Sequence, residues 1–402
     1  MRTRQLSRVI GAALAGMLIL AGCDLSVSNP GPLADADLNT PDAMNGLVVG
    51  MSADLSVAVG QLIRATTMMS DEMTHSGNYA NEGWWYAGDF GPEHVNAEWA
   101  DMQRARWEAE HGIDRMKDVL GSSFDASPLA PRAYLLAGYA NRLIGETVCQ
   151  AIIDGGAPQS DSVHFQRAED QFTTALTLAQ AQGLTTLVNA ARAGRASVLA
   201  DQGDWTNAVV DAALVPASFE YDAIFSLNTS RENNDFAYET INRREYSVAG
   251  TAWADVLNDP RVPWDTVYTS SGRVQTGNDG HTPFFRQTKY TSLAANVPLS
   301  KGTEMLMIRA EAALRANDLA TFTDRINDAR DVYGLAHITQ PADANTAWTA
   351  MQFERGATLW LEVRRFWDLR RWGREGRNTF LQGRADCIPV SLNEELSNKN
   401  IP

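Results

Sequence analysis

A segment rich in aromatic and amide side chains, between residues 71 and 99, is the part of the sequence best suited to bind a small polar ligand. A sugar ring presents apolar C–H faces and a rim of hydroxyl groups, so a sugar site needs flat aromatic side chains together with amide, carboxylate or guanidinium groups. We expect this segment to be a loop between two helices, and it contains both kinds of residue. The candidate ligand-binding residues are Asn78, Tyr79, Trp84, Trp85, Tyr86 and Asn96.

Core packing is the alternative to ligand binding for the adjacent pair Trp84 and Trp85, since tryptophan is highly buried on average. Neighbouring residues on a non-helical segment point to different sides. We therefore expect at least one of the two in the core, and both interpretations stay open for the pair.

A second group of charged residues lies between Glu354 and Arg377, where seven arginines accompany four acidic residues. Such a group could bind phosphate or another anion. However, Arg364, Asp368 and Arg371 are spaced i, i+4 and i+7, which places them on one face of a helix, where they can pair with one another. We therefore favour a structural role over an anion site.

The sequence contains no motif of a catalytic or metal centre. Its six histidines form no H-E-x-x-H pair, and it has neither a G-x-S-x-G elbow nor a Walker-type G-K-S/T loop. We expect no catalytic residue, no metal and no cofactor. A glycosidase needs only two carboxylates about 5–10 Å apart, so an all-α glycoside hydrolase is one alternative. A helical-repeat lipoprotein that binds only protein partners is another.

The N-terminus has the organisation of a bacterial lipoprotein signal. Three arginines among the first eight residues precede an uncharged apolar run over residues 9–21, which is shorter than the roughly 20 residues that span a bilayer. The run leads into Leu-Ala-Gly-Cys, which resembles the lipobox, whose cysteine receives a diacylglycerol. We predict that residues 1–22 are a signal peptide, that Cys23 is lipidated, and that the polar residues 23–36 form a tether.

Cys149 and Cys387 are the two cysteines that remain once Cys23 is acylated. Export would deliver them to an oxidising compartment, where two thiols within reach of each other form a disulfide. Such a bridge would join an early helix to the C-terminal tail. Alternatively, both are buried free thiols that lie far apart, and the sequence leaves both possibilities open.

The composition is that of an ordinary globular protein, with 44% hydrophobic and 21% charged residues in a chain of 402. Acidic residues outnumber basic ones by 49 to 34, which makes the formal net charge −15. A chain this acidic repels a phosphate backbone, so we expect no nucleic acid among its partners.

Helical periodicity dominates the body, which we predict to be all-α over residues 37–402. Apolar residues recur at helical spacing in 37–216 and 303–377. Residues 217–302 are rich in aromatic residues but have no helical period, so we expect an irregular insertion there, and residues 378–402 should form an extended tail. The expected helices are 41–66, 99–120, 132–153, 162–182, 184–214 with a break at Gly203-Asp204, 303–332 and 346–372.

Two parts of this scaffold repeat one pattern. Arg195-Ala196 is followed by Asp204, and Arg309-Ala310 is followed by Asp318, each aspartate nine residues after its arginine. Small residues where helices approach closely, and a turn between them, are typical of tetratricopeptide-like helical pairs. A set of unrelated α-hairpins is the alternative.

Several segments, most of them in the C-terminal half, form a recognisable pattern together with the lipobox. The most specific is Phe-Trp-Asp-Leu-Arg-Arg-Trp at 366–372, and the others are 259–261, Lys289-Tyr290, Pro298-Leu299, 304–312, Glu354-Arg355, Leu361-Glu362 with Arg364, Ile388-Pro389 and the terminal Asn-x-Asn-Ile. In these segments the chain resembles the SusD/RagB family of nutrient-uptake outer-membrane lipoproteins. It departs from the family at Val363, where glycine is frequent.

The resemblance implies a tetratricopeptide-like helical scaffold with long irregular ligand-binding insertions, and it places part of the ligand surface in the segment 71–99. It further implies a non-catalytic protein, lipid-anchored at the outer membrane and facing outward. Such a protein would capture a nutrient, an oligosaccharide first and a peptide second, and would deliver it to a SusC-type TonB-dependent transporter.

Overall fold

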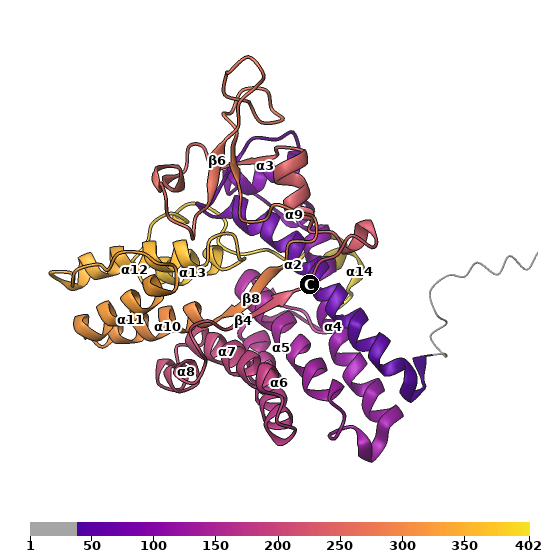
Figure 1. The fold of residues 1–402 in the computed structure, drawn as a ribbon. Coiled ribbons are helices and arrows are strands. Elements are labelled where there is room, and N and C mark those ends of the chain that lie inside the picture. The colour runs from indigo at the N-terminus through magenta and orange to yellow at the C-terminus, as the bar shows by residue number, and fades with distance from the viewer. Residues whose placement is uncertain (1–37) are drawn as a thin grey trace, which may run out of the picture. The chain divides into compact units, whose positions relative to one another are not determined.

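The computed structural model describes residues 38–402, and all the elements below belong to the body, residues 41–402. The predicted signal peptide 1–22, the lipidated Cys23 and the tether 23–36 lie outside the described residues. The body consists mainly of α-helices, as the periodicity predicts, and its strands pair as short two-stranded ladders (Figure 1).

Helix α2 (Met44–Met69), which follows a 3-10 turn (Pro41–Ala43), is the central core helix. By length and composition it could cross a membrane, but half of its most apolar stretch is buried inside the fold. Its apolar side chains belong to the same core cluster as those of α4 (Asn96–Leu120) and α5 (Leu129–Thr147), the helices that pack against it. Helix α2 is therefore an interior helix, and its existence was predictable from its spacing of apolar residues.

The other scaffold helices pack as successive hairpins, and α8 lies against α10 so that the two halves of the scaffold meet (Figure 1). Helix α5 ends earlier than the predicted residue 153, because a short strand begins at Gln150. The bounds are α6 (Ser162–Ala181), α7 (Thr185–Asp201), α8 (Trp205–Ala212), α10 (Gly302–Arg315), α11 (Leu319–Val332), α12 (Ala344–Thr358) and α13 (Arg365–Arg374).

The predicted repeat is present as two helix–turn–helix units, α7–α8 and α10–α11. In each turn the residue before the aspartate has a left-handed backbone, with φ of +85° at Gly203 and +59° at Asn317. Asp204 and Asp318 then accept the backbone N–H three residues later, at 3.1 and 3.0 Å, and so cap the second helix of each unit. The two units are therefore built in the same way at the turn.

The chain between α8 and α10 has little regular structure. Strand β4 (Glu220–Ala223) pairs antiparallel with β8 (Val297–Lys301), which joins the two ends of this region. Strand β5 (Tyr246–Ser247) pairs with β1 (Thr74–His75), which links the region to the chain after α2. The other elements of the body are β2 (Gln150–Ala151) with β3 (Gln159–Ser160), β6 (Trp264–Thr266) with β7 (Phe285–Gln287), α9 (Asp235–Ala237), a π turn (Tyr238–Asn242), and 3-10 turns at Pro92–His94, Gly121–Ser123, Ser230–Glu232 and Ala252–Asp255.

The prediction of one helix over 346–372 is wrong in one respect. The structure has two helices there, α12 and α13, with a turn between them. Leu361 and Val363 have φ of +58° and +66°, a conformation that L-residues rarely adopt and that glycine adopts freely. The rest of the fold holds this turn. Leu361 donates its N–H to Glu72 Oε1 at 2.6 Å, and its carbonyl accepts the Tyr290 hydroxyl at 2.9 Å.

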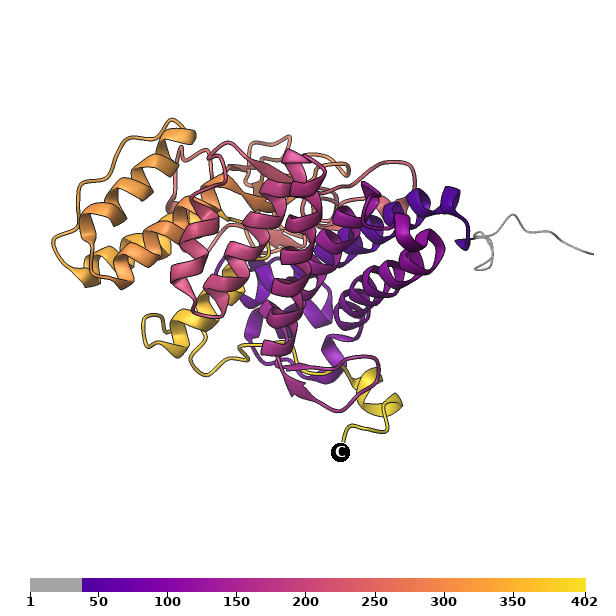
Figure 2. The ribbon, with the colours of Figure 1, turned by 90° about the horizontal axis from the view of Figure 1, so that it is seen from below.

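The C-terminal tail is not wholly extended, because it includes α14 (Leu392–Ser397), which Ser391 caps. Figure 2 shows the tail, in yellow, beside the short hairpin that follows α5. Asn398 Nδ2 donates to the Gly156 carbonyl at 3.0 Å there. The tail also places Cys387 beside Cys149, with Sγ atoms 2.08 Å apart and Cα atoms 5.0 Å apart.

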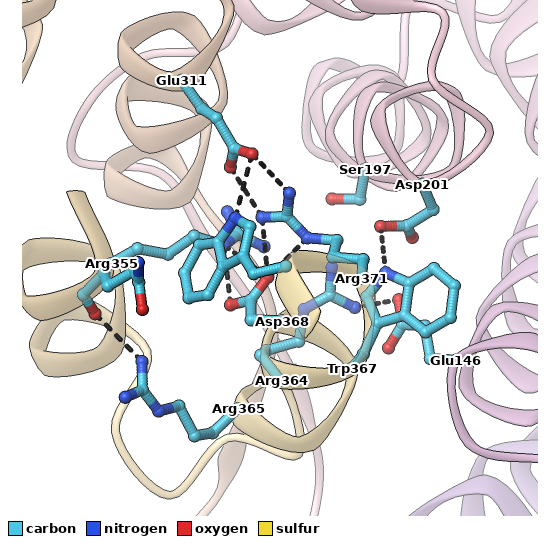
Figure 3. Close-up of polar contacts among 12 residues, drawn as sticks. Glu146, Ser197, Asp201, Glu311, Arg355, Arg364, Arg365, Trp367, Asp368 and Arg371 are labelled. Atoms are coloured by element: carbon cyan, nitrogen blue, oxygen red, sulfur yellow. Dashed lines mark hydrogen bonds and ion pairs between the residues drawn. The ribbon is translucent and has the colours of Figure 1, made fainter. Parts of the chain in front are cut away.

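The arginines around α13 are buried among carboxylates (Figure 3). Arg364 contacts Glu146 of α5 and, with Nη2 at 2.9 Å from Oε1, Glu304 of α10. Arg371 binds Glu311 through Nη2 and Oε2 at 2.6 Å. Burial by itself would raise the pKa of Glu311, but the neighbouring Arg371 and Arg315 outweigh it and lower that pKa to about 2.

The predicted pairing along one face of α13 is only partly correct. Asp368 binds Arg371 and Arg355, each at 2.8 Å, whereas Arg364 turns away from Asp368 to the carboxylates of α5 and α10. These guanidinium groups hold four helices together. Arg355, Arg364 and Arg371 therefore have the structural role that the sequence favours.

Candidate ligand-binding site

The segment predicted as an aromatic loop contains a helix, α3 (Ala80–Ala87), and this corrects the loop interpretation. Gly88, with φ of +72°, ends it by donating its N–H to the Trp85 carbonyl at 3.0 Å. Arg64 of α2 forms an ion pair with this helix, because its guanidinium lies 2.7 Å from Glu82 Oε1. The aromatic residues are therefore distributed by a helical period of about 100° per residue and not by loop geometry.

Trp85 is a core residue. Only 2% of it is exposed, and its indole N–H donates to the His94 carbonyl at 3.0 Å. The packing interpretation therefore holds for this member of the pair.

Trp84, in contrast, is 45% exposed. Its ring stacks on the ring of His94, with centroids 5.3 Å apart and planes 29° apart. His94 Nδ1 accepts the Gly91 N–H at 2.9 Å, which holds the imidazole in place and leaves the hydrogen on Nε2 in the neutral form. We call this stacked pair, in which Trp84 is the exposed member, the Trp84–His94 platform. Asn81, exposed and one turn earlier on α3, lies on the same face of the helix.

Tyr86 is also exposed, at 41%, but it is two positions after Trp84 and therefore lies on the opposite side of α3. Its carbonyl accepts Arg384 Nη2 at 2.7 Å. Arg384 lines a cavity of about 450 Å³, together with Arg370, Arg374 and Asp386. The two exposed aromatic residues thus belong to different surfaces.

The three remaining candidates do not join the platform. Asn78 is exposed, and its backbone N–H donates to Glu245 Oε2 at 2.9 Å. Tyr79 is half-buried under the Arg243 guanidinium, whose carbon lies 4.7 Å from the ring centroid. Asn96 starts α4, and its Oδ1 accepts the Asn393 N–H at 3.0 Å, which ties the tail to this helix. The six residues therefore do not form one site.

Sequence reasoning missed His94 and Asn81. Asn81 would have been found if α3 had been predicted, because it is three residues before Trp84. Nothing in the sequence pairs His94 with Trp84, since the contact depends on the turn at Pro92–His94 that returns the chain to α3. A second concave region of about 580 Å³ lies in the insertion, beside Trp264 and Asn258.

Comparison with known proteins identifies relatives of this chain. Residues 285–399 match the SusD family model. NanU of B. fragilis is similar over 92% of this chain and 98% of its own, with a TM-score of 0.68 and 14% identity. A SusD superfamily protein from Bacteroides vulgatus is similar over 90% of this chain and 98% of its own, with a TM-score of 0.67 and 13% identity.

A further solved structure, described as a SusD-like carbohydrate-binding protein from Bacteroides vulgatus, covers 82% of this chain and 83% of its own, with a TM-score of 0.59 and 16% identity. None of the curated protein sequences matches the chain. At these identities the structural matches establish the fold.

Proposed function

Because this chain is a protein of the SusD/RagB family, we propose that it is a surface lipoprotein that captures an oligosaccharide and delivers it to a SusC-type TonB-dependent transporter of the outer membrane. A peptide is the second ligand class. The observation that carries the ligand proposal is the Trp84–His94 platform, a stacked aromatic pair whose Trp84 is exposed, with the amide Asn81 on the same helix face.

The chemistry of the platform fits a neutral sugar. A pyranose ring can lay its C–H face on the indole, while the Asn81 amide offers both a donor and an acceptor to the hydroxyl rim. The formal charge of −15 disfavours an acidic ligand. A relative of the same fold is described as carbohydrate-binding, which supports the same ligand class.

We propose that binding occurs without bond breaking. To test this against the glycoside hydrolase alternative, the purified protein is incubated with the oligosaccharide that it binds most tightly in a panel of neutral glycans. We expect the oligosaccharide to be recovered intact by chromatography. Shortened products above the background would favour the hydrolase.

Replacing Trp84 with alanine should weaken binding of that oligosaccharide by about 1–3 kcal/mol, because the stacking surface is lost. Thermal stability should change little, since the side chain is already 45% exposed. Isothermal titration calorimetry and a thermal melt measure the two effects.

Trp107 offers a matched control for this experiment. It is also 45% exposed and stacks on a histidine, His111, with centroids 4.2 Å apart, but it lies on α4. Trp107→Ala should leave the affinity unchanged. If it abolished binding while Trp84→Ala did not, the ligand site would be on α4 and the platform assignment would be wrong.

The lipid anchor is tested at Cys23. Cys23→Ala should release the protein from the membrane fraction, because one lipid-modified residue provides the proposed attachment. Fractionation and immunoblotting compare it with Cys387→Ser, which should stay on the membrane. A Cys23→Ala protein that remained in the membrane fraction would contradict the lipoprotein proposal.

Delivery to a transporter is tested separately. The lipidated protein is purified in mild detergent from its own outer membranes, and the co-purifying proteins are identified by mass spectrometry. We expect a large TonB-dependent barrel in stoichiometric amount. Recovery of the protein alone under conditions that preserve other outer-membrane complexes would count against this partner.

A further inference from the structure

We infer that His75, Glu82 and Glu245 form a binding site for one divalent transition-metal cation such as Zn²⁺. One ring nitrogen of His75 and one carboxylate oxygen of each glutamate all lie within 4.8 Å of one another. An imidazole with two carboxylates is a donor set that suits zinc and related divalent ions, whereas calcium takes six to eight oxygen ligands. Three protein ligands would leave one position of the metal open.

The backbone brings these residues together. His75 is in β1 and pairs directly with Tyr246 in β5, so that Glu245, immediately before β5, lies beside it. The Ser76 N–H donates to the Glu245 carbonyl at 2.9 Å and continues the ladder. Glu82 comes from α3, where Arg64 and the Tyr246 hydroxyl both bind its Oε1.

The cluster also contains buried polar atoms that lack a partner. Within residues 38–402, neither Glu82 Oε2 nor His75 Nε2 has a hydrogen-bond partner, and both atoms are buried. Glu82 as a whole is 1% exposed. An unpaired buried polar atom is costly, and coordination to a cation would satisfy both.

The local charge points to a divalent cation. Arg64 pairs with Glu82 and Asp235, at 2.7 and 2.6 Å. Arg243 pairs with Glu239 and Glu245, at 3.3 and 3.1 Å, so four carboxylates share two guanidinium groups. With all four carboxylates ionised, the formal charge of this group is −2, and Asp279 adds negative potential at His75. A divalent cation would neutralise this excess.

The position gives the metal a consequence for the fold. It would connect α3 to the β1–β5 ladder, and Gly83, next to Trp84 in sequence, already faces the His75 ring. The metal would therefore hold α3, the helix that contains Trp84, in place. The metal site is inferred from the contacts within the cluster, and this inference does not depend on which sugar the protein binds.

The test uses the full-length protein without an affinity tag, after EDTA treatment and removal of the chelator. Titration with ZnCl₂ should show one site per chain, and zinc should raise the melting temperature by several degrees. His75→Asn should weaken zinc binding by roughly 100-fold or more, because even outer-shell partners of metal ligands are worth about 10- to 100-fold. His337→Asn, at an exposed histidine outside the cluster, should bind like the wild type.

The melting temperature of His75→Asn without metal should equal that of the EDTA-treated wild type, which separates loss of the ligand from loss of the fold. If that variant does not fold, Glu82→Gln takes its place with the same expected loss. Absence of zinc binding in the wild type would overturn the inference. So would zinc binding that persists unchanged in a folded His75→Asn or Glu82→Gln protein.

Discussion

Arg364→Met should lower the free energy of unfolding by about 3–5 kcal/mol, the cost typical of removing one partner from a buried ion pair. Arg364, Glu146 and Glu304 are each at most 3% exposed at their side chains. Methionine fills similar space but leaves two buried carboxylates without the guanidinium that they share. Because these carboxylates belong to α5 and α10, the loss should loosen contacts between the two halves of the scaffold.

Urea unfolding of the Cys23→Ala form, followed by circular dichroism, measures this change. Arg104→Met is the matched control, since Arg104 pairs with Asp101 at 3.1 Å on the surface, where such pairs contribute about 0–1 kcal/mol. The loss in free energy of unfolding for Arg364→Lys should lie between those for Arg364→Met and Arg104→Met. Lysine keeps the charge but cannot bind both carboxylates as the planar guanidinium does. A loss below 1 kcal/mol for Arg364→Met would contradict the scaffold role of the network.

Removing the Cys149–Cys387 bridge should lower the free energy of unfolding by about 2–5 kcal/mol. The two residues are 238 positions apart, so the bridge closes a long loop and restricts the unfolded chain. In the folded protein it joins the chain just after α5 to the tail. There the Ile388 N–H donates to the Thr147 carbonyl at 2.7 Å, and the Cys149 N–H donates to the Ile388 carbonyl at 2.9 Å. Backbone pairing thus holds the two cysteines in register.

The bridge itself is tested by intact mass after alkylation under denaturing conditions, with and without reductant. The exported protein should take up no label at Cys149 and Cys387 until it is reduced. Two labelled thiols in the unreduced protein would rule the bridge out. The free energy of unfolding in urea should be the same for the double variant Cys149→Ser/Cys387→Ser and for the reduced wild type, which serves as its control.

The helices that were predictable are those with a long amphipathic pattern. Helix α2 has apolar residues at helical spacing over more than six turns, and α7–α8 and α10–α11 add capping aspartates at equal spacing. Helix α3 has neither signal, because it is eight residues long and contains Gly83 and three consecutive aromatic residues. Arg64, which lies on another helix, contacts it through Glu82. The break at Leu361 and Val363 was hidden for the same reason, since Glu72 and Tyr290 hold it from distant parts of the chain.

The candidate site was predictable from residue types but not in the placement of its side chains. Residue types alone indicated that Trp84 lies in a region suited to a sugar, and that one of the two adjacent tryptophans is in the core. They could not show that Tyr86 faces another surface, because that follows from the helical state of α3. The His75, Glu82 and Glu245 cluster depends on pairing between β1 and β5, so the sequence motifs that predicted no metal could not detect it.

A crystal structure of the protein with the oligosaccharide that binds most tightly in the glycan panel would show where the ligand lies. We predict that a sugar ring stacks on the Trp84 indole and that the Asn81 side chain binds one of its hydroxyl groups. A ligand bound elsewhere, for example in the concave region beside Trp264, with Trp84 left uncovered, would contradict the assignment of the platform as the binding site.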